Sequence, residues 1–107
     1  MKIRKVGEAN YEAAETATKY VTWESDYVAS EREKGAVHVL TTASGMVFTS
    51  KIQGIIGADE PGVWADVTTA KSGIYYHQDT PMPRFMRAEI VMTTNPNGGD
   101  VEVWVME

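Results

Sequence analysis

The chain has 107 residues, of which 43% are hydrophobic and 23% are charged, a composition typical of one globular domain. Its net charge of −5 argues against general binding to nucleic-acid backbone or to anionic lipid, because both need a basic surface. The absence of cysteine excludes disulfides, thiolate nucleophiles, cysteine-ligated zinc and iron–sulfur clusters.

The first third of the chain differs in character from the rest. It is dense in charged side chains and contains no glycine after Gly7. We expect residues 1–17 to form an N-terminal arm that is extended or partly helical. One or two helical turns over residues 8–17 would be capped by Asn10. Residues 18–107 then form the folded domain.

Short runs rich in β-branched and aromatic residues make up the rest of the chain. From Gly35 onward, glycine, proline and asparagine clusters separate them about every 8–12 residues, the spacing of a sandwich or barrel. In several runs apolar and polar side chains alternate, so each strand has one packed side and one wet side. We therefore predict an all-β fold, an antiparallel, jelly-roll-like β-sandwich of six to eight strands. The expected strands cover residues 18–23, 36–42, 46–56, 63–68, 74–77, 84–92 and 100–106.

Local chemistry predicts the connections and one core residue. Residues 43–45 indicate a tight hairpin between the two runs that flank them, and residues 95–99 are the clearest turn in the chain. Two prolines exclude residues 80–83 from a central strand, because proline cannot donate a ladder hydrogen bond. Trp64 is large enough to fill much of a small core.

No constellation of residues predicts catalysis or metal binding. His38 lies within a strand-like run that offers no nucleophile or orienting group. His77 and Asp79 provide two metal ligands, whereas a zinc site takes three or four, and we interpret this segment as a polar loop. Residues 59–60 with Asp66 lack the spacing of a calcium loop. We expect no catalytic residue, no metal, no cofactor and no enzymatic activity.

Exposed aromatic side chains are the best candidates for contacts with a partner. Neighbouring strand residues point to opposite faces, so Tyr75 and Tyr76 cannot both lie in the core. Trp104 shares its face with Glu102, which indicates an outer surface. The candidate assembly contacts are Ile3, Arg4 and Tyr11 in the arm, and Tyr75 and Trp104 in the sandwich.

Several motifs appear in an order that resembles a known family. A strand ends in the pair Gln53-Gly54, a turn leads into Trp64, residues 84–88 read Arg-Phe-Met-Arg-Ala, and a glycine-rich hairpin follows at residues 98–99. This pattern, over about residues 36–106, is similar to the small β-sandwich domains of tailed-bacteriophage virion proteins, of the head decoration and accessory type. The turn before the tryptophan departs from the Ser-Asn-Asp-Gly type that is common in that family.

The resemblance implies a non-enzymatic virion structural protein that is assembled in the host cytoplasm. A head decoration or cement protein, which stabilises the capsid shell through multivalent contacts, is the first expectation. Its partners would be the major capsid protein or other virion proteins, and further copies of the chain, with a trimer by analogy. Nucleic acid and membrane are not expected, since the chain is acidic and lacks an apolar window of roughly 18 residues. A carbohydrate-binding module and a tail or connector component of the same virion are the alternatives.

Overall fold

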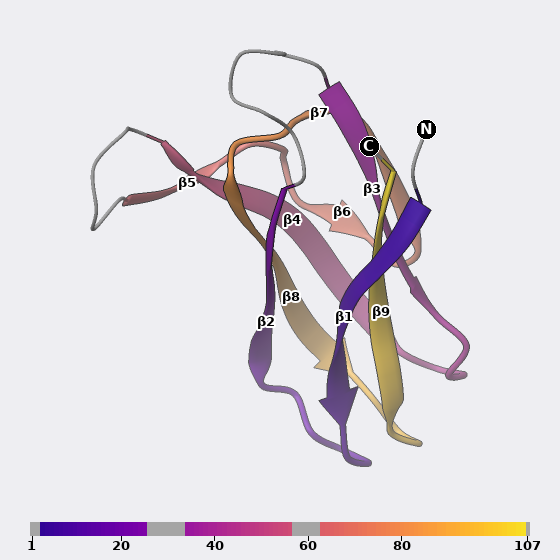
Figure 1. Ribbon diagram of the computed structural model, residues 1–107. Helices are drawn as coiled ribbons and strands as arrows, with labels where there is room; N and C mark the ends of the chain where they lie inside the picture. The colour runs from indigo at the N-terminus through magenta and orange to yellow at the C-terminus, as the bar shows by residue number, and fades with distance from the viewer. Residues whose placement is uncertain (1–2, 26–33, 57–62, 107) are drawn as a thin grey trace.

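The structure is a computed structural model that describes residues 3–25, 34–56 and 63–106. These residues form two antiparallel β-sheets packed face to face, which confirms the predicted all-β sandwich (Figure 1). They contain no helix that is long and apolar enough to cross a membrane. The strands are β1 (Ile3–Tyr11), β2 (Thr18–Glu24), β3 (Lys34–Thr41), β4 (Val47–Ile56), β5 (Val63–Asp66), β6 (Lys71–Ser72), β7 (Tyr75–Pro81), β8 (Phe85–Thr94) and β9 (Gly99–Met106).

The strand order identifies the sandwich as a jelly roll. The four-stranded sheet A has the order β1-β9-β3-β7, and the five-stranded sheet B has the order β2-β8-β4-β5, with the short β6 beside β4. Apart from β6, the first strand pairs with the last, the second with the second-last, and so on inward to β4 with β5. This nested pairing is that of a long hairpin rolled into a double sheet, which is the jelly-roll arrangement. The terminal strands therefore lie side by side, with Ile3 opposite Met106 (Figure 1).

The core lies between the sheets and follows the alternation in the sequence. Every second residue of β4, β8 and β9 points inward and is buried, as predicted. The prolines also act as predicted, because β7 is an edge strand of sheet A and ends at Pro81. The buried alternating residues are Phe48, Ser50, Ile52 and Gly54 in β4, Met86, Ala88, Ile90 and Met92 in β8, and Val101, Val103 and Val105 in β9.

The N-terminal segment differs from the expected arm. Residues 3–11 form β1, which pairs with β9 and belongs to the sandwich. Ala9 and Tyr11 are buried in the core, and Asn10 lies within the strand instead of capping a helix. The physical reason is that a helix of one or two turns is marginal by itself. Pairing with β9, in contrast, satisfies the backbone and buries apolar side chains.

The two predicted turns cross between the sheets. Residues 43–45 do not form a hairpin, since β3 lies in sheet A and β4 lies in sheet B. They form an arch, in which Gly45 adopts a φ of 80° that favours glycine. The turn at residues 95–99 is confirmed, and it carries the chain from β8 in sheet B to β9 in sheet A.

Asn95 ties this second turn to the connection between β1 and β2. Its side chain is buried, and its Nδ2 donates to the carbonyl oxygens of Glu12 at 2.8 Å and Glu15 at 3.1 Å. Its Oδ1 accepts a hydrogen bond from the backbone N–H of Gly98 at 3.0 Å. One amide side chain therefore holds two loops together at this end of the sandwich.

Candidate functional site

The outer face of sheet A carries a cross-strand row of aromatic side chains. Trp104 of β9 lies between Lys5 of β1 and His38 of β3, and His38 lies opposite Tyr76 of β7. The rings of His38 and Tyr76 meet edge to face, with their centroids 5.7 Å apart. Further apolar side chains extend the row on the same face. We call this surface the sheet A patch, and it comprises Ile3, His38, Leu40, Tyr76, Trp104 and Met106.

Fixed contacts hold the aromatic members of the sheet A patch. The indole N–H of Trp104 donates to Oε1 of Glu102 at 2.8 Å, and the hydroxyl of Tyr76 donates to Sδ of Met106 at 3.4 Å. Ile3 is 61% exposed and Tyr76 is 36% exposed, while the other members are half-buried. The patch is therefore an ordered, partly apolar surface on the outside of the molecule.

Two of the five predicted contact residues lie on this surface, and a neighbour replaces a third. Ile3 and Trp104 belong to the sheet A patch. Tyr75 does not, because alternate residues of a strand point to the same side. Tyr75 lies two residues before buried His77 in β7, so it points inward as His77 does. Tyr76 is the tyrosine that faces outward. The sequence reduced the choice to two adjacent residues, and only the packing of β7 decides between them.

Tyr11 is not a contact residue, because it is a core residue. It is 5% exposed, its hydroxyl donates to the carbonyl oxygen of Ala17 at 3.0 Å, and Nζ of Lys19 lies 4.6 Å from its ring centroid. Burial, and to a smaller extent the charge of Glu15, raises the pKa of Tyr11 to about 12. The prediction failed because it treated β1 as a separate arm.

Arg4 joins the two sheets at their open edge. It lies opposite buried Val105, and its Nη2 donates to the carbonyl oxygen of Glu24 in β2 at 2.7 Å. Since β1 belongs to sheet A and β2 to sheet B, this side chain supports the sandwich itself.

His77 and Ser50 form a buried polar pair between the sheets. Nε2 of His77 lies 3.1 Å from Oγ of Ser50, and the two side chains are 2% and 1% exposed. Burial, with a smaller contribution from the charge of Lys71, lowers the pKa of His77 to about 4. The imidazole is therefore neutral at pH 7. The interpretation of this segment as a polar loop is therefore wrong. His77 lies in β7, where it bridges sheet A to sheet B.

His77 and Asp79, which we weighed as metal ligands from the sequence and rejected, belong to no candidate metal cluster among the residues that the structure describes. No group of three histidine, aspartate or glutamate side chains that could hold a metal ion is found within residues 3–25, 34–56 and 63–106. Residues 59–60 lie outside the described residues, so the expectation that they form no calcium site stays a prediction.

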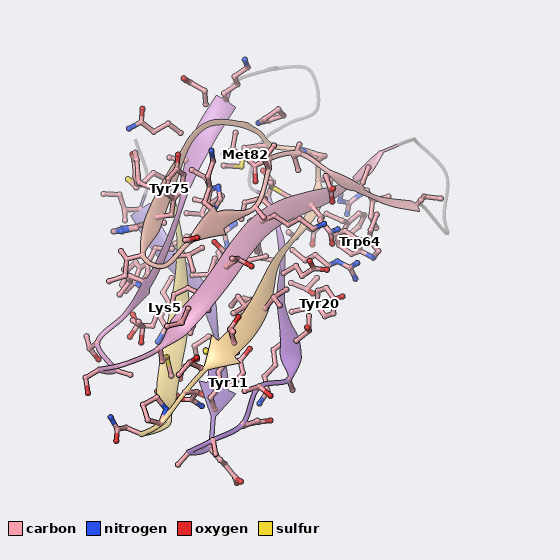
Figure 2. The ribbon with its side chains drawn as sticks, turned by 180° about the vertical axis from the view of Figure 1, so that it is seen from behind. Lys5, Tyr11, Tyr20, Trp64, Tyr75 and Met82 are labelled. Atoms are coloured by element: carbon pink, nitrogen blue, oxygen red, sulfur yellow. The ribbon has the colours of Figure 1, made fainter. Side chains whose placement is uncertain are left out.

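The outer face of sheet B carries a second organised surface, centred on Arg87 of β8. The guanidinium carbon of Arg87 lies 4.2 Å from the ring centroid of Tyr20 in β2 and 4.4 Å from that of Trp64 in β5. Figure 2 shows the labelled Tyr20 and Trp64 on the same side of the molecule. Contrary to the prediction, Trp64 does not fill the core. It is half-buried, because its place in the register puts it on the outer face with Ile55.

Polar side chains continue this surface across β4. Nε of Arg87 donates to Oε1 of Gln53 at 2.7 Å, and Nε2 of Gln53 donates to Oδ1 of Asp66 at 2.9 Å. Lys51 lies 3.3 Å from Asp66 and 3.7 Å from Glu89. Hydrogen bonds from Gln53 and then from Lys51 lower the pKa of Asp66, so its carboxylate is ionised at neutral pH.

The amino-acid sequence does not reveal this second surface as a unit. Alternation correctly placed Lys51, Gln53, Arg87 and Glu89 on the outer sides of β4 and β8, although Gln53 is buried there. Nothing local indicates that aromatic residues from the two edge strands converge on one arginine. Tyr20 comes next to Arg87 because β8 pairs with β2 and β4. These pairings are the information that the sequence lacks.

No family model matches the chain, and no curated protein or solved structure matches it. Function is therefore inferred from the two outer faces of the sandwich.

Proposed function

We propose that this protein is a non-enzymatic structural subunit of a tailed-phage virion, and first of all a head decoration or cement protein. It packs the outer face of sheet A against a neighbouring subunit of the particle. The jelly-roll order supports a viral role, since this architecture occurs in viral capsid proteins, but it also occurs in lectins and cupins. A fold does not by itself determine function.

The sheet A patch is the observation that carries the proposal. Interface cores are enriched in aromatic residues and methionine and depleted in charged residues. The patch has this composition, with Trp104 and Tyr76 among aliphatic side chains and with Ile3 largely exposed. Tryptophan and tyrosine are also the residues that most often dominate binding energy.

Charged side chains border the patch on the side of β1. Lys5 forms an ion pair with Glu8 at 2.6 Å, and Glu8 lies opposite Glu102 of β9. A polar rim around an apolar centre is the usual anatomy of a protein–protein interface. The strands beneath the patch hold its side chains in place, so little ordering cost is expected on binding.

The partners that this surface fits are the major capsid protein or another virion protein, and further copies of the chain. A cyclic homo-oligomer, such as a trimer, would present several copies of the patch at once. Each contact can then be modest, because symmetric repetition raises the overall avidity. A tail or connector component would use the same surface in a different part of the particle.

Electron microscopy and protein quantification of purified particles test this function. We expect the chain to be present in purified virions, at a copy number that matches a symmetric repeat of the shell. Density on the tail or neck would favour the tail or connector alternative. Absence of the chain from purified particles, while it accumulates free in the lysate, would contradict the proposal.

A further inference from the structure

We propose that the outer face of sheet B is a carbohydrate-binding platform for neutral glycans. Tyr20 and Trp64 stack against sugar rings, the charged side chains beside them bind hydroxyl groups, and buried Gln53 links Arg87 to Asp66. This site lies on the sheet opposite the assembly surface, and it does not depend on the proposed function. We call it the sheet B platform, and it comprises Tyr20, Lys51, Gln53, Trp64, Asp66, Arg87 and Glu89.

The aromatic half of the platform is held in place by Arg87. Its guanidinium lies within 4.4 Å of both ring centroids, so one cation fixes the two rings on the same face. Tyr20 is nevertheless 47% exposed, and Trp64 is half-buried. Aromatic side chains that present an apolar surface together with a polar edge suit a ligand that has both characters. A pyranose has an apolar C–H face and a rim of hydroxyl groups.

The polar half of the platform is a chain of hydrogen bonds that fixes each group. The hydroxyl of Tyr20 donates to Oε2 of Glu89 at 3.1 Å, and Gln53 links Arg87 to Asp66. A carboxylate has about four lone-pair sites and a guanidinium has about five donors, so each retains capacity for a ligand. Hydrogen bonds to charged groups are roughly twice as strong as those between neutral groups. Hydroxyl groups, which both donate and accept, match this mixture.

The charge balance favours a neutral ligand. Lys51 and Arg87 contribute two positive charges, and Asp66 and Glu89 contribute two negative charges on the same face. A surface that binds nucleic acid needs a surplus of positive charge to contact the phosphate backbone. A protein partner is disfavoured as well, because interface cores are depleted in lysine, aspartate and glutamate, the types of Lys51, Asp66 and Glu89. The sheet A patch meets that criterion, and the sheet B platform does not.

The platform is tested with the full-length protein on a glycan array that includes neutral oligohexoses, with a sulfated glycan and single-stranded DNA as charged comparisons. Hits are then titrated by NMR at oligosaccharide concentrations up to about 10 mM. Because the surface is open, we expect an affinity on the order of 1 mM for a single site. Chemical-shift changes should map to β2, β4, β5 and β8.

The variants compare aromatic residues on the two faces. We expect Trp64→Ala and Tyr20→Ala each to weaken binding at least tenfold, Trp64→Phe to retain most of it, and Trp104→Ala on sheet A to leave it unchanged. Arg87→Lys keeps the charge but loses the planar guanidinium, and it should weaken binding as well. Circular dichroism identifies any variant that fails to fold, and the shift map of the unaltered protein then decides.

Three results would overturn the inference. They are no binding of any oligosaccharide on the array or in titration, shift changes confined to sheet A, and equal binding by Trp64→Ala and the unaltered protein. If no oligosaccharide binds and the variants only lower the melting temperature, the network is purely structural. None of these results affects the virion proposal, which is decided by the presence of the chain in particles.

Discussion

Nε2 of His77 in sheet A lies 3.1 Å from Oγ of Ser50 in sheet B, and both side chains are enclosed in the core. Neither group reaches the surface, so the pair cannot act on a substrate. It joins the two layers by a polar contact at a position where most neighbours are apolar. A buried hydrogen-bonded pair of this kind contributes to stability only while both partners are present and neutral.

Acidification should destabilise the fold through His77. Its pKa is about 4 in the folded protein and near 6.5 in the unfolded chain, so the unfolded state binds more protons between these values. The free energy of unfolding should therefore fall as the pH drops from about 6.5 through 4, by about 3 kcal/mol in total. Urea unfolding at a series of pH values between 7.5 and 4 measures this loss. In His77→Gln the pH dependence over this window should be smaller by that amount, and an identical dependence would refute the assignment.

Removing the serine partner should cost stability at neutral pH. Ser50→Ala leaves a buried imidazole nitrogen without its partner, which typically costs about 1–3 kcal/mol. Thr49→Ala is the matched control, because Thr49 is the next residue in β4 and points to the outer face. Urea unfolding of both variants checks this. Equal stability of the two would show that the bridge contributes nothing.

Asn95 should be much more important to stability than Asn97. Asn95→Ala removes three hydrogen bonds from a buried side chain, and we expect a loss of about 2–4 kcal/mol. Asn97 is exposed, and its side chain hydrogen-bonds only to Ser44 among the described residues, at 3.2 and 3.3 Å, so Asn97→Ala should cost less than about 1 kcal/mol. Thermal melts of the two variants give the comparison, and a larger effect of Asn97→Ala would contradict it.

The first strand should be indispensable for folding. Deleting residues 1–11 removes an edge strand together with the buried side chains of Ala9 and Tyr11, and we expect loss of cooperative unfolding. Tyr11→Ala alone should cost about 3–5 kcal/mol, as large aromatic truncations in a core do. Tyr11→Phe removes only the hydrogen bond to Ala17 and should cost about 1 kcal/mol. A deletion variant that still unfolds cooperatively would restore the interpretation of this segment as an arm.

Substitution in the sheet A patch should weaken association without unfolding the protein. We expect Trp104→Glu to weaken binding to shells, or association with further copies, by more than about 30-fold, the effect of a central hot spot of about 2 kcal/mol. Val91→Glu places the same charge on the outer face of sheet B and should leave association unchanged. Sedimentation with particles and light scattering measure the two effects. Unaltered association of Trp104→Glu would remove the patch from the interface.

Much of the fold could be predicted because, along a strand, the alternation of apolar and polar residues shows directly which side chains are buried. In β8 and β9 the apolar residues at every second position are the ones that the structure buries, and no other information was needed. In β1 the alternation is weak. Lys5, Glu8 and Asn10 face outward, and the partner that makes this segment a strand is β9, at the other end of the chain.

The candidate surfaces were less predictable because they depend on pairing between distant strands. Local reasoning placed Trp104 outside, correctly, because its own strand alternates clearly. It placed Trp64 inside, wrongly, because Arg87, which packs against the indole, comes from another strand. It chose Tyr75 as the outward residue, wrongly, because the direction of the side chains in β7 depends on where His77 is buried.

A photo-crosslinking amino acid at Tyr76, compared with the same group at Tyr20, tests the assembly surface most directly. Both tyrosines are exposed, and they lie on the outer faces of opposite sheets. In purified particles we predict crosslinks from position 76 to a neighbouring virion subunit and none from position 20. Crosslinks to virion subunits from position 20 alone, or from neither position, would contradict the account.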